Sequence, residues 1–584
     1  MEATNLSKIK REKMLFTLSE IKKTTTDEET LNNLSLIENE LTSKKYGLIW
    51  EEHKENVDEK LENNIPVFQE EKNKEIKAGE DSGLNFILEG DNLHSLYLLE
   101  KTHRDKIDII YIDPPYNTGS DTFIYNDKIV DDLDGYRHSK WLSFMEKRLK
   151  IAKNLLCENG VIMISIDENE VSQLRLLCDE IFGETNRLST HHVQVRYGNK
   201  SLNEDNDWQP VMEYVLIYAK NKLLFKANKP SEPYDLSKFC YKITELKKGK
   251  KIKIGNKDVT IFKDGEWKIE QVKDGGIGYL KETWASGSIV RQSGTAAEFL
   301  SKYLIQRKEE DGLNVLYKID NMGEDGLGYR YVTGPKKIDA IRGKFYSGVP
   351  LDRLKELEQG VSKKTRPIVN LYDYSGDFGN IRSEGNVPFN NGKKPIKMIK
   401  ELINYHTNKN ALVLDFFAGS GSTGHAVLDL NKEDNGNRKF ILCTNNENNI
   451  CEEITYKRLV NVIKGYGKYK PLKANLKYYK TAYVPRVNSD DNNLHDKLIK
   501  NITNLVQLEN GVSVDNKKIR LFMDEEKFDK FFENESELNE CDKIYISSDI
   551  LMTSKQEAIL DNNNIELFII PEYYFKEEIM EVTE

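Results

Sequence analysis

The sequence predicts an α/β protein whose core is a parallel, doubly wound sheet. Short runs of β-branched and aromatic residues alternate with amphipathic helical segments between about residues 85 and 218, and this alternation returns at Lys393. Two predicted strands end in an acidic residue that is followed by prolines or by a glycine-rich run, at Asp113 and at Asp415. Open α/β sheets bind ligands at the carboxyl ends of their strands, so we expect the function to lie there.

The composition narrows the class of protein. A chain of 584 residues is long enough for roughly two to four domains with packed cores. It has no long apolar run and no charged-then-apolar N-terminus, so we expect a protein that neither spans a membrane nor is secreted. The six cysteines form no Cys-x-x-Cys pair, which argues against a disulfide framework or a zinc site and favours a reducing cytoplasm.

The net charge of −10 hides an uneven distribution. Residues 186–392 carry 35 Lys and Arg against 27 Asp and Glu, whereas residues 475–584 carry 13 against 23. The basic excess in the middle of the chain favours a polyanionic partner at that place.

The first segment, residues 1–80, is charged and helical by pattern. Apolar residues recur at steps of three and four, at Leu15, Leu18, Ile21, Leu34, Ile37 and Leu41. Such stripes dock on a neighbouring domain or on a second copy of the chain, so we assign this segment to assembly. Pro66 and the charged stretch 70–81 are predicted to be a connector.

Residues 81–220 are predicted to form the first half of the sheet. A strand at 85–89 ends in Gly90-Asp91-Asn92 before a helix at 93–100, and Asp91 either contacts a nucleotide or caps that helix. The pivotal strand is described in the next paragraph. After it, this half is predicted to continue with a helix at 136–156, which Gly160 terminates, a strand at 161–167, a helix at 169–182, and strands at 190–196 and 212–218.

The pivotal strand, residues 107–112, leads into Asp113-Pro114-Pro115-Tyr116. Its apolar composition predicts burial on both faces, and the two prolines end it because they cannot donate ladder hydrogen bonds. One carboxylate and one aromatic ring are therefore held at the carboxyl end of a central strand. The loop 117–134 is typical of loops that close over a substrate, and equally of ordinary surface loops.

From residue 221 to residue 392 the alternation stops, which predicts an inserted domain. Lysines, glycines and short strand-like runs dominate, with Trp267, Trp284, Tyr329 and Tyr331 between them. A basic excess with interspersed aromatics suits a surface that grips a duplex, while most of these aromatics must also form the core of the insert itself. The arginines that we consider for DNA contact are Arg291, Arg330, Arg342 and Arg353.

The second half of the sheet is predicted at residues 393–475. Pro395 opens an amphipathic helix at a favoured first-turn position, and a strand at 411–415 then enters the run Asp415-Phe416-Phe417-Ala418-Gly419-Ser420-Gly421. Glycines occur where a backbone turns tightly and a ligand approaches closely. The absence of Gly-Lys-Ser/Thr excludes a phosphate-cradling P-loop, but Gly419, Gly421 and Gly424 fit the spacing of a dinucleotide site.

Two further features complete the chain. Glu447 lies 26 residues beyond Gly421, where the second strand of such a fold presents an acid to ribose hydroxyls. Residues 476–584 are predicted to form a separate small α/β domain with short strands around 519–523, 543–547 and 565–570. This C-terminal domain contains no catalytic constellation, so we assign it to assembly or partner docking.

Asp-Pro-Pro-Tyr resembles the catalytic tetrapeptide of amino-group methyltransferases that act on nucleic-acid bases, and the Asp-Phe-Phe-Ala-Gly run resembles their S-adenosylmethionine loop. Their order, with the basic insert between them, is similar to that of beta-class DNA amino-methyltransferases. The closest resemblance is to the modification (Mod) subunits of type III restriction systems, carried by Gly90-Asp91-Asn92, the stretches 111–119 and 451–456, and the insert stretches 293–296 and 342–350. The likeness covers about residues 80–470.

The resemblance implies a circularly permuted Rossmann-like methyltransferase sheet, S-adenosylmethionine as cofactor and double-stranded DNA as substrate. It also implies a homodimer and a separate helicase-nuclease restriction (Res) subunit. Asp113, Pro114, Pro115 and Tyr116 would be catalytic. The residues that it places at the cofactor are Asp91, Pro395, Asp415, Phe417, Ala418, Gly419, Ser420, Gly421 and Glu447, and it implies no metal.

In that mechanism the target base is flipped out of the duplex and stacks on Tyr116, while Asp113 and the carbonyl of Pro114 accept the two hydrogens of its amine. Aspartate before Pro-Pro favours adenine N6 over cytosine N4. Methylation of RNA or of a protein glutamine is a further alternative, but the large basic insert is unexpected there. A module that only binds DNA for a nuclease partner would tolerate loss of Asp113 or of the glycine turn, and both are intact.

Overall fold

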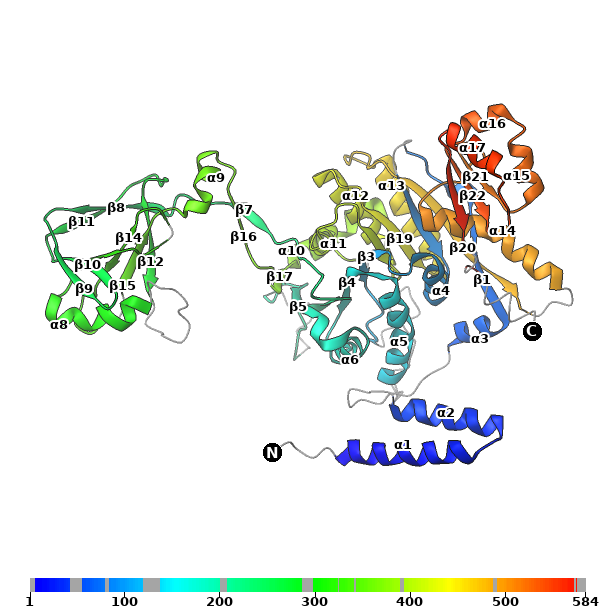
Figure 1. Ribbon diagram of the computed structural model, residues 1–584, viewed down its shortest axis with the longest axis horizontal. Coiled ribbons are helices and arrows are strands. Elements are labelled where there is room, and N and C mark those ends of the chain that lie inside the picture. The colour runs from blue at the N-terminus through cyan, green and yellow to red at the C-terminus, as the bar shows by residue number, and fades with distance from the viewer. Residues whose placement is uncertain are drawn as a thin grey trace. The chain divides into compact units, whose positions relative to one another are not determined.

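The computed structural model describes residues 6–42, 55–78, 83–118, 137–199, 207–285, 298–323, 325–340, 343–388, 393–486, 491–571 and 574. It divides into two compact units, one formed by Met1–Asn228 with Val369–Glu584 and the other by Lys229–Ile368. Figure 1 labels the elements of both units. The loop predicted at 117–134 lies outside the described residues except for Asn117 and Thr118.

The first unit is built on a mixed sheet that has ten strands among the described residues, in the order β1-β20-β2-β19-β18-β3-β4-β6-β5-β17 (Figure 1). The six strands from β20 to β4 run parallel to one another. The bounds of the ten strands in sheet order are Asn64–Glu70, Asn475–Pro485, Leu84–Glu89, Lys439–Thr444, Leu412–Asp415, Ile107–Ile112, Leu156–Ile166, Met212–Ala219, Arg187–Gln194 and Leu371–Asp373.

The prediction of a parallel sheet is wrong at its two ends. Strand β6 is antiparallel to both β4 and β5, and β1 is antiparallel to β20. Strand β6 follows β5 without a helix between them in the described residues, and such a connection suits an antiparallel pair because a parallel pair needs a crossover. The reversed strand brings its first residues to the edge where the parallel strands end.

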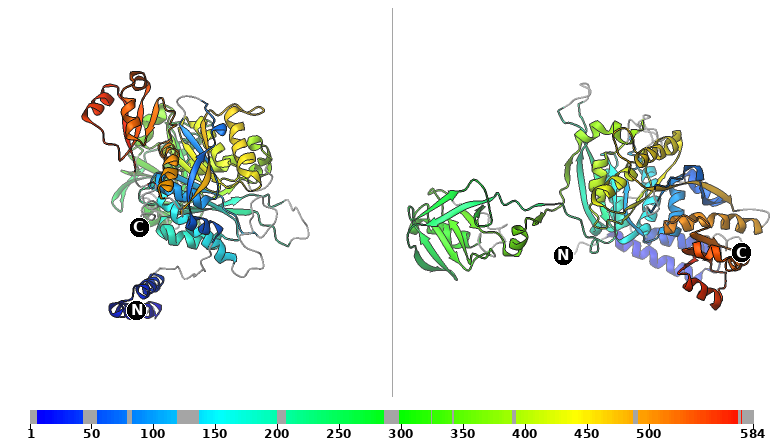
Figure 2. Two further views of the ribbon diagram at one scale, coloured as in Figure 1. Left: turned by 90° about the vertical axis from the view of Figure 1, so that its right-hand side faces the viewer. Right: turned by 90° about the horizontal axis from the view of Figure 1, so that it is seen from above.

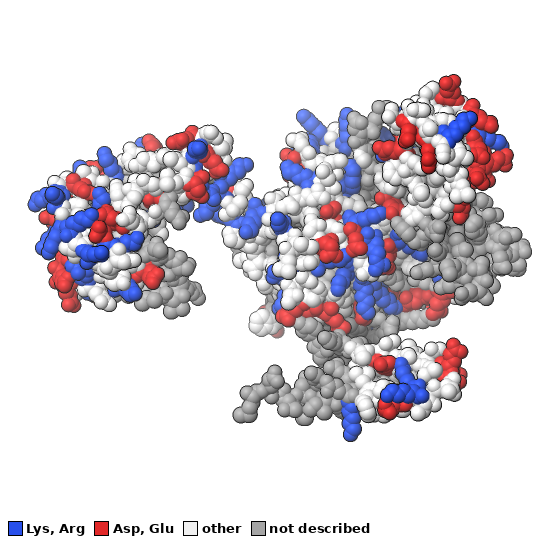
Figure 3. All heavy atoms as spheres, in the orientation of Figure 1, with Lys and Arg blue, Asp and Glu red and all other residues white. Residues whose placement is uncertain are grey.

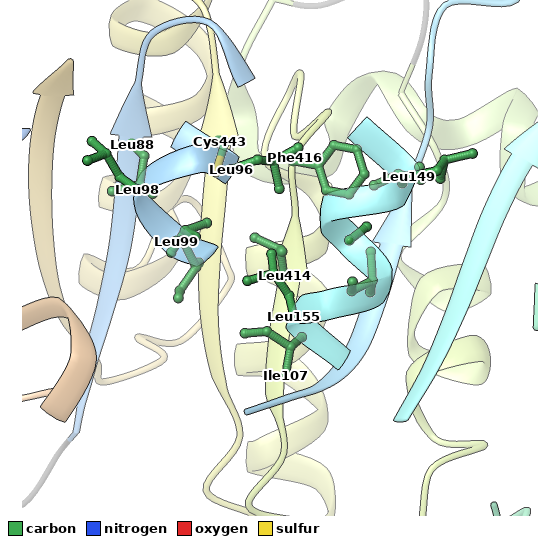
Figure 4. Close-up of a cluster of buried hydrophobic side chains, with 14 of the residues drawn as sticks. Leu88, Leu96, Leu98, Leu99, Ile107, Leu149, Leu155, Leu414, Phe416 and Cys443 are labelled. Atoms are coloured by element: carbon green, nitrogen blue, oxygen red, sulfur yellow. The ribbon is translucent and has the colours of Figure 1, made fainter. Parts of the chain in front are cut away.

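Helices cover both faces of this sheet (Figures 1 and 2). Helices α4, α5, α6 and α14 pack in one layer, and α11, α12 and α13 pack in another. Their bounds are Asn92–His103, Arg137–Leu155, Val171–Cys178, Asp491–Asn510, Ile396–Ile403, Ser422–Asp434 and Lys457–Lys464, and the short α10 is Ser375–Asn380. The main core lies between the sheet and the first layer, where Leu96, Leu99 and Leu149 meet Leu88, Leu414 and Cys443 (Figure 4).

The N-terminal segment is not wholly helical. Helices α1, α2 and α3 span Leu6–Thr24, Glu28–Thr42 and Asn56–Asn63, but β1 then joins the sheet. Pro66 therefore lies in a strand rather than in the predicted connector. Strand β1 has a ladder partner on one side only, in the described residues, so a residue without an N–H is tolerated there.

The long helix predicted at 136–156 ends at Leu155, as expected, but Gly160, which was predicted to terminate it, lies inside β4. A side chain at position 160 would place its Cβ 2.9 Å from the carbonyl oxygen of Cys157 and 3.0 Å from that of Ile107. Glycine is therefore required by close backbone packing at this point, and not by the end of a helix.

The second unit is smaller than the insert predicted at 221–392. Strand β17 pairs with β5, and Ala227 forms a bridge with His406, so the two ends of the predicted insert pack on the first unit. The unit contains an eight-stranded antiparallel sheet in the order β11-β8-β12-β15-β14-β13-β10-β9 and a two-stranded pair of β7 with β16, both counted over the described residues. The bounds of β7 to β16 in chain order are Ser231–Pro233, Phe239–Glu245, Lys250–Ile254, Lys257–Phe262, Trp267–Gln271, Leu280–Ala285, Leu316–Asp320, Tyr329–Thr333, Gly343–Ser347 and Lys363–Thr365.

The eight-stranded sheet curls on itself (Figure 2). Glu245 on β8 accepts hydrogen bonds from Lys318 on β13 and Tyr331 on β14, although two strands separate β8 from β14 in the sheet order. Trp267 and Tyr331 pack in the cluster inside the curl, so these aromatics form the core of the insert. Among the described residues of this unit, the short α-helices are α8, Lys308–Asp311, and α9, Leu354–Glu358.

The C-terminal segment begins later than residue 476, because β20 runs to Pro485 within the main sheet. Beyond α14 a three-stranded parallel sheet of β21, β22 and β23 has its own small core. The bounds of β21 to β23 and of α15 to α17 are Ile519–Phe522, Lys543–Ser547, Glu566–Ile570, Glu525–Phe531, Glu535–Glu540 and Ser554–Asn562. Figure 3 shows acidic side chains gathered over this end of the unit. Among the described helices, none combines the length and the apolar composition of a membrane span.

Candidate active site

The turn Asp113-Pro114-Pro115-Tyr116 leaves the sheet at the end of β3, and helix α5 holds it. The indole nitrogen of Trp141, on α5, donates a hydrogen bond of 2.8 Å to the carbonyl oxygen of Pro115. Trp141 is fully buried, so the turn is attached to a rigid part of the core. Among the described residues no donor reaches the carbonyl oxygen of Pro114, which leaves this oxygen available to a ligand.

Asn117, the residue after the tetrapeptide, also holds this turn in place. Asn117 adopts a left-handed backbone conformation with φ 57°, which asparagine tolerates better than most residues. Its side-chain amide donates a hydrogen bond of 2.6 Å to the buried carboxyl of Glu170. The ring of His138, on α5, lies 2.8 Å from the same oxygen of Glu170. The tetrapeptide is thus held at both ends.

A charged cluster surrounds Asp113, and two of its members were missed by the sequence analysis. The ammonium of Lys394, just before α11, lies 3.1 Å from Oδ1 of Asp113 and 3.1 Å from Oε2 of Glu213 on β6. The hydroxyl of Tyr116 lies 2.9 Å and 3.0 Å from the same two oxygens. Lys394 also lies over the Tyr116 ring, 4.7 Å from its centre.

Most of the cluster is shielded from solvent, since the side chains of Asp113, Glu213 and Lys394 are 19%, 21% and 7% exposed, and this sets its electrostatics. Burial raises the pKa of the Asp113 carboxyl above its usual value, although the Lys394 ammonium lowers it and the Glu213 carboxylate adds to the rise. Burial by itself would lower the pKa of Lys394, but its two carboxylate partners raise it above the usual value, so the ammonium stays charged. The pKa of Tyr116 is raised by burial and by both carboxylates, so the phenol stays neutral.

The second predicted motif is the glycine turn between β18 and α12. The side chain of Asp415 holds this turn by accepting hydrogen bonds. One carboxylate oxygen of Asp415 accepts a hydrogen bond of 3.0 Å from the Phe417 amide, and the other accepts one of 2.5 Å from the hydroxyl of Thr423. Burial raises the pKa of Asp415 to about 7. The side chain therefore orders the turn, and its contact with a cofactor remains a prediction.

The backbone of this turn needs its glycines. Gly419 has φ 47° and Gly421 has φ 74°, conformations that L side chains rarely adopt. A Cβ at Gly421 would lie 3.2 Å from Cγ2 of Thr455. Ala418 is buried and its amide donates to the carbonyl of Cys443 at 3.1 Å, which ties the turn to β19.

Ser420 is held by an arginine that the sequence analysis did not single out. Arg458, on α13, is fully buried and donates to the hydroxyls of Ser420 and Ser422 at 3.1 Å and 2.8 Å. Thr455 donates to the carbonyl of Gly419. The Asn92 amide donates to the carbonyl of Phe416 at 2.9 Å, which ties the turn to α4. Arg458, Thr455 and Asn92 lie outside the glycine motif, so the motif could not predict their contacts with the turn.

The remaining predicted cofactor residues lie at other strand and helix ends. Asp91 accepts a hydrogen bond of 2.8 Å from the Leu93 amide, so it caps α4. Pro395 precedes α11 as its cap instead of occupying its first turn. Glu447 is exposed and follows β19, and the half-buried ring of Phe417 lies 5.9 Å from that of Phe144. Contact of these residues with a cofactor remains a prediction.

The order of the strands brings these positions to one edge of the sheet. Asp415 is the last residue of β18, and Asp91, Glu447 and Asp113 follow β2, β19 and β3. These four strands are consecutive parallel neighbours. Glu213 joins them because β6 is antiparallel and begins at this edge, opposite the end of β4. The glycine turn and the tetrapeptide are separated by about 300 residues in sequence but follow paired strands, with Leu414 opposite Ile110.

The arginines considered for DNA contact in the insert are only partly described. Arg291 and Arg342 lie outside the described residues. Arg330 is mostly buried and lies 3.4 Å from the carboxylate of Asp325, and Arg353 donates to the carbonyl of Lys363 at 2.7 Å. More exposed cations lie on and just before β9, at Lys247, Lys248, Lys250, Lys251 and Lys253. No cluster of metal-ligating side chains occurs in the part of the chain that the structure describes.

Comparison with known proteins gives a consistent set of relatives. The model of a family described as DNA methylase matches residues 107–457. The Mod subunit of the type III restriction-modification enzyme EcoPI, from Escherichia phage P1, is 30% identical over 72% of this chain and 66% of its own length. The corresponding subunit of StyLTI, from Salmonella typhimurium, is 31% identical over 62% of this chain and 52% of its own length. The chain thus spans about half to two thirds of the length of these two relatives.

Relatives of another type are also found. The type II methyltransferase M.KpnI, from Klebsiella pneumoniae, is 29% identical over 65% of this chain and 84% of its own length. Among solved structures, the cytosine-N4-specific PvuII DNA methyltransferase aligns with 74% of this chain and 96% of its own at 11% identity, with a TM-score of 0.32.

Proposed function

The chain belongs to the DNA methylase family, and on that premise we propose that it is a site-specific DNA methyltransferase that transfers a methyl group from S-adenosylmethionine to adenine N6 in duplex DNA. The observation that carries the proposal is the pairing of β18 with β3. It brings the glycine turn, as cofactor site, beside Asp113-Pro114-Pro115-Tyr116, as catalytic site, at one edge of the sheet.

The described residues fit the cofactor. The glycine turn presents backbone without side chains at two left-handed positions, which allows a nucleoside to approach closely. Glu447 is exposed at the end of the neighbouring strand, where an acid suits ribose hydroxyls. When bound, S-adenosylmethionine supplies an electrophilic methyl group on a sulfonium sulfur.

The catalytic turn supplies acceptors for the amine of the base. That amine is a poor nucleophile because its lone pair is delocalised into the ring. Oδ1 of Asp113 is already held by Lys394 and Tyr116, whereas Oδ2 accepts no hydrogen bond from the described residues. Oδ2 and the carbonyl oxygen of Pro114 are therefore the two acceptors that would bind the amine hydrogens and localise the lone pair. The new N–C bond would form as the sulfur–methyl bond breaks, so that S-adenosylhomocysteine leaves, and one of these hydrogens would be released as a proton to water.

Tyr116 is proposed to stack on the flipped adenine. Extruding a base from a duplex costs a few kcal/mol, and stacking on an aromatic ring offsets about 1–3 kcal/mol of it. The Tyr116 hydroxyl is fixed by Asp113 and Glu213, so its ring is held ready before the base arrives.

The insert is proposed to recognise the DNA. The exposed lysines of the β9 region, 247–253, suit contacts with the phosphate backbone, which position a protein but do not read sequence. Figure 3 shows further Lys and Arg side chains on the same unit. Arg330 and Arg353 are less suited, since both already have partners in the protein.

We further propose a circularly permuted methyltransferase sheet and an assembly of type III. The permutation is supported by the order of the chain, in which the catalytic strand β3 precedes the cofactor strand β18 although the two are neighbours. The type III assembly is supported by the Mod relatives, which are named as subunits of type III restriction-modification enzymes, and we propose a homodimer that serves a helicase-nuclease restriction subunit. Exposed apolar side chains on α1 and α2, at Phe16, Leu36 and Ile37, suit an assembly surface.

The experiment that tests the function uses the full chain, S-adenosylmethionine with a labelled methyl group, and unmodified DNA. Modified DNA is digested to nucleosides, and the label is expected in N6-methyldeoxyadenosine. Label found only in N4-methylcytosine would refute the target base but keep the enzyme class. Parallel reactions contain RNA or protein in place of DNA, and label found there, with none in DNA, would refute the function of the insert.

A further inference from the structure

Four side chains from distant parts of the chain form a closed group at the catalytic turn. We propose that Lys394 and Glu213 are positioning residues for methyl transfer. Together they orient the Asp113 carboxylate and fix Tyr116 beside the target base, and Lys394 alone favours the ionised form of Asp113. This inference rests on the proposed function. It assigns roles to two residues outside the tetrapeptide and outside the glycine turn.

The geometry supports positioning because the two carboxylates share the same two donors. The Lys394 ammonium is 3.1 Å from one oxygen of each carboxylate, and the Tyr116 hydroxyl is 2.9 Å and 3.0 Å from the same oxygens. Asp113 is thereby held through Oδ1 alone. Its other oxygen accepts no hydrogen bond from the described residues and is left for the amine of the substrate.

Lys394 is suited to this task because it is itself confined. Its side chain is 7% exposed, and it immediately precedes Pro395, whose fixed backbone angle leads into α11. Glu213 is confined by β6, where its neighbour Tyr214 pairs with Ile166 on β4. The ammonium and the second carboxylate therefore come from two rigid elements, while Asp113 and Tyr116 come from a turn.

The two residues have opposite electrostatic effects on Asp113. A buried carboxyl favours its neutral form, and a neutral Asp113 would carry a proton on one oxygen and be a weaker acceptor for the amine hydrogen. Lys394 opposes the effect of burial and Glu213 adds to it. The other titratable groups that face Asp113 are Tyr111 on β3 and Asp415 after β18, and Asp167 after β4 faces Glu213.

Because the two residues act on Asp113 in opposite directions, replacing them should shift the pH dependence of methyl transfer in opposite directions. The single-turnover rate of methyl transfer is measured with the full chain across the pH range in which carboxylates titrate. Replacing Lys394 by Met should move the acid limb of the profile to higher pH, and replacing Glu213 by Gln should move it to lower pH. Each pKa unit of movement corresponds to roughly a tenfold change in rate below the limb.

Conservative and matched variants complete the test. Lys394→Arg keeps a cation and should restore a limb close to that of the unmodified chain. Lys393→Met removes an equally buried neighbour whose ammonium donates to the carbonyl of Val387 instead, so it should leave the acid limb in place even if the melting temperature falls. Calorimetric binding of S-adenosylmethionine shows that each variant still has its cofactor site.

The outcomes separate the inference from the function on which it rests. An unmodified chain that transfers no methyl group to DNA refutes the proposed function. An active chain whose acid limb does not move in Lys394→Met and Glu213→Gln, or moves in the same direction in both, refutes the positioning roles. If Lys394→Met fails to fold, Glu213→Gln alone decides, since a limb that stays in place or moves to higher pH overturns the proposal.

Discussion

At the scale of single residues, the site depends on a largely buried carboxyl group whose ionised form is opposed by burial and by Glu213 and favoured by Lys394. Asp113 has one oxygen engaged by Lys394 and Tyr116 and another that accepts no hydrogen bond from the described residues. Asp113 can therefore accept a hydrogen bond from the substrate amine through one oxygen while the other keeps its contacts with Lys394 and Tyr116. The consequences can be measured at Asp113 and at Tyr116 separately.

Replacing Asp113 by Ala should abolish methyl transfer, since the amine would lose an acceptor that matters most in the transition state. We expect a fall in rate of at least about 10²-fold, the size seen when one such polar group is removed. Calorimetric affinity for S-adenosylmethionine should stay near that of the unmodified chain. The measurement is transfer of labelled methyl to DNA.

Asp108 provides the control for this prediction because it lies on the same strand at the opposite end. Its carboxylate accepts hydrogen bonds from the Leu412 amide at 2.9 Å and from Asn408 at 3.1 Å. Asp108→Asn should therefore lower the melting temperature and spare the rate per folded molecule. Methyl transfer by Asp113→Ala at the normal rate would refute the mechanism.

Replacing Tyr116 by Ala should weaken catalysis more than DNA binding, because phosphate contacts dominate affinity. Loss of stacking of about 1–3 kcal/mol corresponds to roughly a 5- to 150-fold fall in rate. Tyr116→Trp keeps a stacking face and should retain more activity than the alanine variant. Tyr116→Phe removes only the hydroxyl that contacts Asp113 and Glu213, so it separates the two roles of the side chain.

Base flipping itself is checked by fluorescence. A 2-aminopurine at the target position should brighten when the protein binds, because it leaves its stacked neighbours. The absence of brightening, with normal methyl transfer to the unlabelled site, would count against stacking of a flipped base on Tyr116.

At the scale of elements, the glycine turn between β18 and α12 is the part that should govern cofactor affinity. It is anchored from four sides, by Asp415 within the turn, Asn92 from α4, Arg458 from α13 and the Cys443 carbonyl from β19. A turn held in this way cannot relax when a side chain is added at a left-handed position. A side chain added there should therefore lower cofactor affinity in two ways, by straining the backbone and by blocking the approach of the cofactor.

Replacing Gly419 by Val should lower affinity for S-adenosylmethionine by at least about tenfold, since a β-branched residue at φ 47° costs about 1–3 kcal/mol before any clash with the ligand. The measurement is isothermal titration calorimetry. Gly467→Val is the matched control, because Gly467 has φ 53° and open space around it. Equal affinity loss in both variants would show that strain alone, and not the cofactor site, explains the effect.

At the scale of the whole molecule, the insert is a unit with its own core, bounded by the short pair of β7 with β16. Its borders differ from those predicted from composition. Residues 369–388 carry β17, which extends the main sheet, and the Val387 carbonyl, which accepts a hydrogen bond from Lys393. The stability of a chimera should therefore depend on which residues are chosen as the ends of the replaced insert.

Replacing residues 229–368 by the corresponding unit of a relative should change the methylated sequence without changing the chemistry. Sequencing of modified bases in DNA from cells that express the chimera gives the measurement. A folded chimera that still marks the original site would show that specificity lies elsewhere. The wider replacement of residues 221–392 should reduce stability, because it removes β17 and the segment that contacts Lys393 and Arg458.

The sequence by itself determined the parts of this protein whose chemistry is local. The tetrapeptide and the glycine turn are contiguous, and each requires a special backbone that only proline or glycine supplies, so they are visible without a structure. The main strands and helices follow from their apolar periodicity, and the inserted unit follows from the loss of that periodicity. Even there, single positions such as Pro66 and Gly160 were assigned to the wrong feature, since both residues have more than one structural use.

Only the tertiary structure decided which distant residues complete the site. Glu213, Lys394 and Arg458 are ordinary residues in their own elements and belong to neither of the two motifs. Glu213 reaches Asp113 because β6 runs against its neighbour β4, so that its first residues lie where the parallel strands end. Strand direction and strand order depend on how the whole chain packs, which is why the charge balance around Asp113 could not be predicted from the sequence.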